Sequence, residues 1–226
     1  MPDQILVSHF RRGLDRQTVL QQLSCAPGSA AQTELLASFE QLEPFFRQSV
    51  KPKAVIAFGY APVELQNEFL KAGDAVAFVI STLGNEVERV AKEYFEQKDY
   101  FSGMVLNAMA DAYLFSMEQE LLETLKTACK ARGVGVESRL EAPLHLPMEA
   151  QIIAVRETDA EKLLGISVTE GLMLYPVKSC CFVAKLTPDS SVFCAAHDCG
   201  GCPNLSCSLR NPVCEEGPQA LTRRRC

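Results

Sequence analysis

The sequence predicts an α+β fold, in which helices pack on a mixed or antiparallel sheet and a short cysteine-rich tail follows. Its 226 residues suffice for one domain with a substantial core and a small appendage. Helical and strand-like patterns do not alternate regularly along the chain, which favours α+β over a parallel α/β arrangement. Six of the ten cysteines lie between Cys194 and Cys226. We therefore expect an α+β domain over residues 1–193 and a metal-binding tail over residues 194–226.

The first 80 residues contain two kinds of apolar pattern. A helical period runs through residues 32–48, and Pro44 is expected to bend or divide that helix. Two short apolar runs flanked by Gly, Pro and Asp predict strands. The elements expected in this part are a short helix at 18–23, the helix at 32–48, strands at 54–58 and 75–80, and a short helix at 63–71.

Two helices are expected in the middle of the chain. A helix over residues 84–97 precedes the longest expected element, a helix that begins after Asp99 and ends near Arg132. Apolar side chains cover most of the first half of this long helix, so we expect it to be largely buried. Gly133 should end it, because glycine commonly follows the last helical residue. Asp111 and Glu118 lie at helical spacing, and we expect them on a solvated face.

The remaining part of the domain mixes short strands with short helices. Pro143 and Pro147 predict an irregular loop over residues 141–147. The elements expected here are a strand at 134–139, helices at 148–155 and 159–164, and strands at 166–169, 172–175, 179–185 and 192–195.

Composition excludes several classes of function. The net charge is −6, whereas binding to the phosphate backbone of a nucleic acid favours a concentrated basic surface. No apolar run approaches the roughly 20 residues needed to span a bilayer. The amino terminus lacks the long apolar run of a secretory signal, so we expect a cytoplasmic protein without nucleic-acid or membrane partners. Cytosolic thiols are kept reduced, which favours metal binding over disulfides in the tail.

The tail cysteines follow the spacing Cys194-x4-Cys199-x2-Cys202-x4-Cys207-x6-Cys214. Two cysteines separated by two residues can bind one metal centre, and four thiolates satisfy either an iron–sulfur cluster or a tetrahedral zinc ion. Zinc sites usually contain a second close pair of ligands, which is absent from this spacing. We therefore prefer an iron–sulfur cluster held by Cys199, Cys202, Cys207 and either Cys194 or Cys214, with structural zinc or redox-active thiols as alternatives.

Two further features have simpler explanations. His197 is a candidate metal ligand, but we prefer the simpler explanation that it is a single exposed histidine. Cys180 and Cys181 lie in an expected strand, where small buried thiols are common.

Residues 81–196 contain several blocks that resemble the activation (reactivation) domain of cobalamin-dependent methionine synthase. The blocks follow one another in the order and with the spacing of the family, over about half of the chain. The blocks are Ser81-Thr82-Leu83-Gly84-Asn85-Glu86-Val87, Asn107-Ala108-Met109-Ala110-Asp111-Ala112-Tyr113, Arg139-Leu140-Glu141-Ala142-Pro143-Leu144-His145, Leu163-Leu164-Gly165-Ile166-Ser167-Val168-Thr169-Glu170, Met173-Leu174-Tyr175-Pro176 with Ser179, and Pro188-Asp189-Ser190-Ser191.

The resemblance implies a curved antiparallel sheet with a shallow groove that binds S-adenosylmethionine. In the family, the methyl group of this ligand is presented to an inactive cob(II)alamin while a donor supplies one electron. Arg139 would hold the ligand's carboxylate through a two-pronged ion pair, and Glu170 would take its amino group or ribose hydroxyls. Backbone groups around Ala142 and Pro143 would border the adenine. The ligand-binding residues implied by the resemblance are Arg139, Ala142, Pro143, His145, Glu170 and Tyr175.

Two functions follow from these patterns. The first is an accessory or reactivation module for a corrinoid protein in methyl transfer, which binds S-adenosylmethionine and delivers an electron from the tail cluster. A separate corrinoid-binding protein or methyltransferase would supply the cobalamin, because 226 residues cannot also contain the substrate and cobalamin modules. The second is a non-catalytic metal-binding protein that docks on a corrinoid protein. Leu144-His145 and Val192-Phe193, which replace a Gly-Tyr and a tyrosine pair of the family, favour the second function over methyl transfer in the groove itself.

Overall fold

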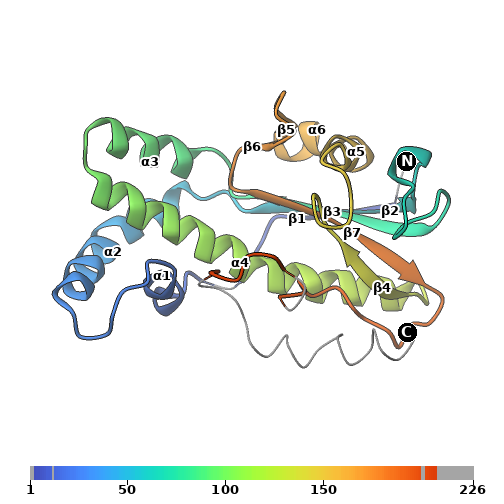
Figure 1. Cartoon of the computed structure of the whole chain (residues 1–226), viewed down its shortest axis with the longest axis horizontal. Helices are drawn as coiled ribbons and strands as arrows, with labels where there is room; N and C mark the ends of the chain where they lie inside the picture. The colour runs from blue at the N-terminus through green and yellow to red at the C-terminus, as the bar shows by residue number, and fades with distance from the viewer. Residues whose placement is uncertain (1–2, 12, 200–201, 208–226) are drawn as a thin grey trace.

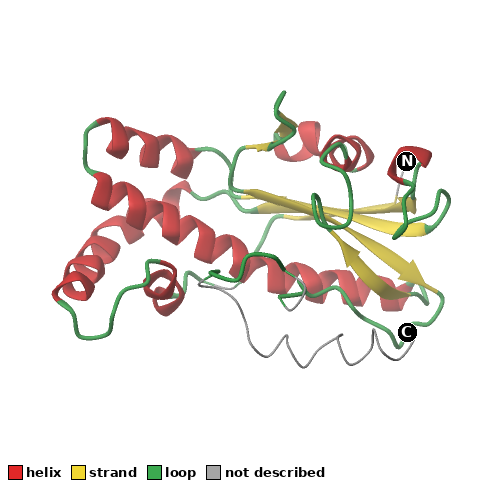
Figure 2. Cartoon of the chain, viewed as in Figure 1, coloured by secondary structure: helices red, strands yellow, loops and turns green. Residues whose placement is uncertain are grey.

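A five-stranded antiparallel sheet forms the centre of the computed structural model, which describes residues 3–11, 13–199 and 202–207 (Figures 1 and 2). The strand order is β1-β2-β3-β7-β4, and every neighbouring pair is antiparallel. The strands are β1 (Asp3–Val7), β2 (Lys53–Tyr60), β3 (Ala75–Thr82), β7 (Ser179–Thr187) and β4 (Gly135–Leu140), and a separate two-stranded sheet joins β5 (Ser167–Val168) to β6 (Leu174–Tyr175).

Helices cover both faces of the sheet. The carboxy-terminal half of α4 (Tyr100–Ala131) packs Leu121, Leu125 and Cys129 on one face. The opposite face is covered by α5 (Ala150–Glu157) and α6 (Ala160–Leu164). Because both faces are buried, β3 is a nearly continuous apolar run rather than an alternating one.

The amino-terminal half of α4 extends beyond the sheet into a second, helical packing unit (Figure 1). It packs there against α1 (Arg16–Gln22), α2 (Ala30–Ser49) and α3 (Glu86–Glu96). The expected ends of α4 are confirmed. Asp99 accepts a hydrogen bond from the Ser102 N–H at 3.1 Å, and Gly133 follows the helix with a φ of +68°.

The structure differs from the expected elements at four places. β1 was not expected, because this edge strand is only half buried and its residues lack a clear alternation. The segment expected as a helix at 63–71 contains only a 3₁₀ turn, η1 (Val63–Leu65), and Asn67 organises the chain after it by accepting hydrogen bonds from the N–H groups of residues 69 and 70. Pro44 does not divide α2, whose buried residues Phe39, Leu42 and Phe46 anchor the helix on both sides of it.

The expected strand at 192–195 is reduced to an isolated bridge between Val136 and Phe193. The chain there runs beside the start of β4 and then leaves the sheet. No helix within the described part of the chain is long and apolar enough to cross a membrane.

Candidate functional site

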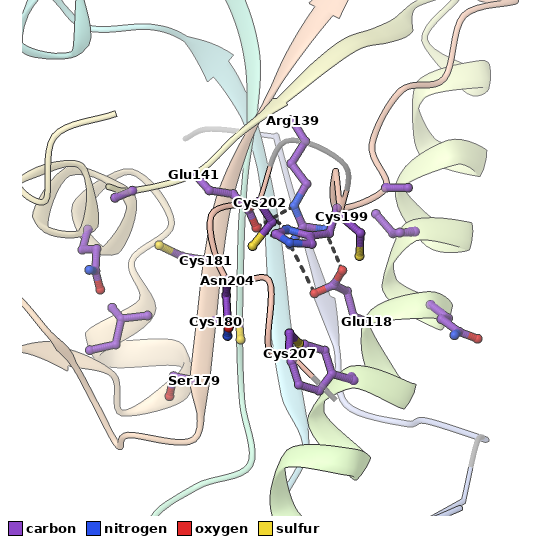
Figure 3. A pocket seen from close by; sticks show the side chains of 18 of the residues that line it. Glu118, Arg139, Glu141, Ser179, Cys180, Cys181, Cys199, Cys202, Asn204 and Cys207 are labelled. Atoms are coloured by element: carbon purple, nitrogen blue, oxygen red, sulfur yellow. Dashed lines mark hydrogen bonds and ion pairs between the residues drawn. The ribbon is translucent and has the colours of Figure 1, made fainter. Parts of the chain in front are cut away.

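A pocket of about 630 Å³ opens where β4 ends and the edge of β7 becomes free (Figure 3). The pairing of β4 with β7 runs from Leu140, which lies opposite Val183, to Gly135, which lies opposite Thr187. Residues 179–182 of β7 therefore have no strand partner on that side among the described residues. The chain after β7 returns to this point and closes the pocket. The walls of the pocket come from α4, β4 and the loop after it, α5, β6 and the turns beside it, β7 and the tail. The lining residues are Phe115, Glu118, Gln119, Leu122, Arg139, Glu141, Ala142, Gln151, Met173, Leu174, Val177, Ser179, Cys180, Cys181, Ala196, His197, Cys199, Cys202, Asn204 and Cys207.

Arg139 is the centre of a buried charge network in this pocket. Its side chain is only 6% exposed, and its guanidinium donates to Glu118 on α4 at 2.6 and 3.2 Å and to Glu141 at 2.9 Å. The guanidinium also lies over the ring of Phe182, 4.1 Å from the ring centroid. Burial alone would lower the pKa of Arg139, but the two carboxylates outweigh that effect and raise it. Arg139 is therefore a permanently charged group that is already neutralised by the protein.

His197 extends the network into the tail. Its Nδ1 lies 2.8 Å from Glu141 Oε2. This hydrogen bond raises the pKa of His197 to about 9, with burial acting in the opposite direction and a hydrogen bond to Cys202 adding to the increase. Burial would raise the pKa of Glu141, yet the hydrogen bond from His197 and the charge of Arg139 lower it to about 2. At neutral pH the network therefore contains two cations and two carboxylates.

Five thiols line the same pocket. Cys199, Cys202 and Cys207 come from the tail, and Cys180 and Cys181 come from β7 (Figure 3). Consecutive residues of a strand point to opposite faces of a sheet. Accordingly, Cys180 packs toward the helical unit of α2, α3 and α4, whereas Cys181 packs toward α5 and α6. Both reach the pocket because it lies at the free edge of β7.

Burial keeps the two strand thiols protonated. It raises the pKa of Cys180 to about 12 and that of Cys181 to about 12, while the charge of Arg139 acts in the opposite direction. A thiol with so high a pKa is a poor nucleophile at neutral pH, since the thiolate is the reactive form.

The residues implied as ligand-binding are only partly brought together. Arg139 and Ala142 line the pocket. Pro143 is exposed beside it, and His145 accepts a hydrogen bond from the Glu141 N–H at 3.3 Å while its ring meets Phe69 edge-on. Glu170 and Tyr175 are exposed on the β5–β6 hairpin, outside the pocket lining.

The expected metal ligands are also divided. Cys199, Cys202 and Cys207 share the pocket. Cys194 lies outside its lining, and its N–H donates to the Val136 carbonyl at 2.9 Å. Cys214 lies outside the described residues. Within the parts of the chain that are described, no three His, Cys, Asp or Glu side chains converge closely enough to hold a single metal ion.

Two acidic residues of α4 were wrongly expected on a solvated face. Glu118 pairs with Arg139, and Asp111 pairs with the buried Lys178 at 2.6 Å. Phe115, Glu118 and Leu122 are three and four residues apart, so they form one stripe of α4 that faces the pocket. An isolated carboxylate within a long apolar stripe is the sequence signal that would have identified Glu118 as part of the site.

Comparisons with known proteins find similarity in structure and not in sequence. No protein-family model matches the chain, and no curated protein matches it. Among solved structures it is similar to the MetH reactivation domain bound to AdoHcy, with a TM-score of 0.59 and 13% identity over 83% of this chain and 79% of that chain. The likeness shows the fold. The prediction of an α+β fold like that of the reactivation domain, with helices on an antiparallel sheet, is confirmed.

Proposed function

We propose that this protein is an accessory module for a corrinoid protein, which takes part in restoring a cobalamin to its methyl-transfer cycle. The observation that carries this proposal is the pocket at the edge of β7, where thiols of the tail lie beside the Arg139 network on a fold shared with the MetH reactivation domain. The cobalamin would be supplied by a separate corrinoid-binding protein.

A ligand of the S-adenosylmethionine type suits the size of the pocket. Small-molecule sites commonly enclose 300–1,000 Å³ with mainly apolar walls. Phe115, Leu122, Met173, Leu174 and Val177 provide such walls here, and the related domain was solved with AdoHcy. Because Arg139 is paired with Glu118 and Glu141, a ligand carboxylate would reach it only by displacing one of these carboxylates. The charged ammonium and sulfonium of the ligand would instead be attracted to the carboxylates themselves.

The tail thiols support electron delivery from an iron–sulfur cluster. Thiolates are the usual ligands of such clusters, and a bound cluster would supply single electrons at low potential. Cys199, Cys202 and Cys207 would hold it. Cobalt(II) of the partner's cobalamin would gain one electron to become cobalt(I), and an external low-potential one-electron carrier would replace that electron. The proposal thus places electron delivery and methyl-donor binding in one pocket.

Anaerobic purification followed by ligand titration tests this function. We expect iron and acid-labile sulfide in the purified chain, and calorimetric binding of S-adenosylmethionine or AdoHcy. Met173→Asp, at an exposed position in the pocket lining, should weaken ligand binding at least tenfold. Met104→Asp is the matched control, because Met104 is similarly exposed but lies outside the lining. A chain that contains no iron and binds neither ligand would contradict the proposal.

The neutralised Arg139 favours a second candidate function. A protein that docks on a corrinoid protein through a metal-bound tail would need no free cation for a ligand carboxylate. Binding of a purified cobalamin-binding domain to the iron-containing chain, with no detectable binding of S-adenosylmethionine or AdoHcy, would select this alternative.

A further inference from the structure

We propose that one of the two β7 cysteines, Cys180 or Cys181, completes the metal centre of the tail by supplying its fourth thiolate. This inference rests on the proposed iron–sulfur centre and changes its ligand set. The tail spacing suggests Cys194 or Cys214 as the fourth ligand, whereas the fold places two other thiols in the pocket that contains Cys199, Cys202 and Cys207.

The position of each cysteine relative to the pocket is the first argument. The three tail thiols in the pocket are one fewer than a four-thiolate centre requires. Cys194 lies outside the lining and is held beside the start of β4 by its backbone hydrogen bond to Val136. Cys180 and Cys181 line the same pocket from a regular strand, whose other edge is paired with β3 from residue 179 to residue 185. The strand thus offers a fixed thiol to the tail.

The spread of the thiols is the second argument. They line the walls of the pocket, and the described side chains do not converge on one point as ligands of a single zinc ion would. In a four-iron cluster each thiolate binds a different iron atom, so the thiolates surround a volume. The pocket of about 630 Å³ is lined by five thiols, which is compatible with that geometry.

Two complementary variants of the full chain test the ligand set after anaerobic reconstitution with ferrous iron and sulfide. The double variant Cys180→Ala/Cys181→Ala should lose at least half of the bound iron and the visible absorbance of the wild-type protein. The triple variant Cys194→Ala/Cys214→Ala/Cys226→Ala leaves the pocket thiols intact and should retain the wild-type iron content. Cys25→Ala, which removes a half-buried thiol far along the chain from the pocket, is the control and should also retain it.

The outcomes separate this inference from the proposed function. A wild-type chain without iron would remove the proposed centre and the inference together. Wild-type iron content in the Cys180/Cys181 variant, or loss of iron in the triple variant, would overturn the inference alone. If circular dichroism shows that the Cys180/Cys181 variant does not fold, the triple variant still tests the inference. It leaves β7 unchanged, and loss of its iron would overturn the inference. The single variants Cys180→Ala and Cys181→Ala then show which of the two strand thiols binds the cluster.

Discussion

Arg139 on β4 and Glu118 on α4 form a two-pronged ion pair, with N–O distances of 2.6 and 3.2 Å, that joins the sheet to the long helix inside the pocket. Glu118→Gln would keep the shape of the side chain and remove its charge. We expect a loss of about 1–3 kcal/mol in the free energy of unfolding, because a buried cation loses one of its two partners. Glu86→Gln is the control, since its pair with Arg89 is exposed and should contribute little. Equal unfolding midpoints in urea for the two variants would contradict this.

Stability should depend on pH through Glu141 and His197. The pKa of His197 is raised from 6.5 to about 9, so its contribution is complete below about pH 6.5 and is lost as the pH rises through 9. The pKa of Glu141 is lowered from 4.5 to about 2, so its contribution is present above pH 4.5 and is lost as the pH falls toward 2. His197 is 40% exposed, so we expect a loss of only about 1 kcal/mol between pH 6 and pH 9.5.

Glu141→Gln should remove most of that loss at alkaline pH. Urea unfolding of the wild type and the variant at both pH values provides the measurement. A wild-type stability that stays constant or increases from pH 6 to pH 9.5 would be incompatible with the ion pair.

Gly135 at the start of β4 should not tolerate a side chain. A Cβ there would lie 2.1 Å from the Asp189 carbonyl oxygen and 2.5 Å from that of Val192. Gly135→Ala must therefore push the backbone before the tail away from β4, and we expect a loss of about 3 kcal/mol in stability. Gly59→Ala in β2 is the matched control, because a Cβ there meets nothing within 4 Å. Similar melting temperatures for the two variants would refute the contact.

The thiols of β7 should react slowly in the metal-free protein. Burial raises the pKa of Cys180 and Cys181 to about 12, so at pH 8 both remain almost entirely protonated. We expect iodoacetamide to modify them at least tenfold more slowly in the folded chain than in the urea-unfolded chain, as measured by peptide mass spectrometry. Equal rates in the two states would show that these side chains are accessible.

The regular elements could be predicted because local signals agree with tertiary packing. The apolar first half of α4, Asp99 before it and Gly133 after it define the longest helix from sequence alone. The apolar runs of β3 and β7 are likewise evident. β1 was missed because its formation depends on pairing with β2 and not on a pattern of apolar residues in its own sequence. In this pairing Asp3 lies opposite Phe58 and Val7 lies opposite Ala54.

The candidate site was only half visible in the sequence. The spacing of the tail cysteines predicts thiolate chemistry, and the resemblance points to Arg139. Nothing local places Cys180 and Cys181 beside the tail. Their exposure to the pocket follows from the end of β4 at Leu140, and α5, α6, β5 and β6 separate that residue from β7 in the sequence. Pairing of Arg139 with Glu118 joins residues 21 positions apart, and the contact of Glu141 with His197 joins residues 56 positions apart.

The chain between β7 and the tail also determines where the protein can be shortened. Ala195 is fully buried, and its carbonyl accepts a hydrogen bond from Arg139 at 3.4 Å. Phe193 lies beside Val136, and the two residues form a bridge. A protein ending before residue 194 would thus expose part of the core that β4 and α4 enclose. A protein ending after His197 would keep these contacts and the Glu141 partner, and is the shorter form best suited to crystallisation of the domain without its cysteine-rich extension.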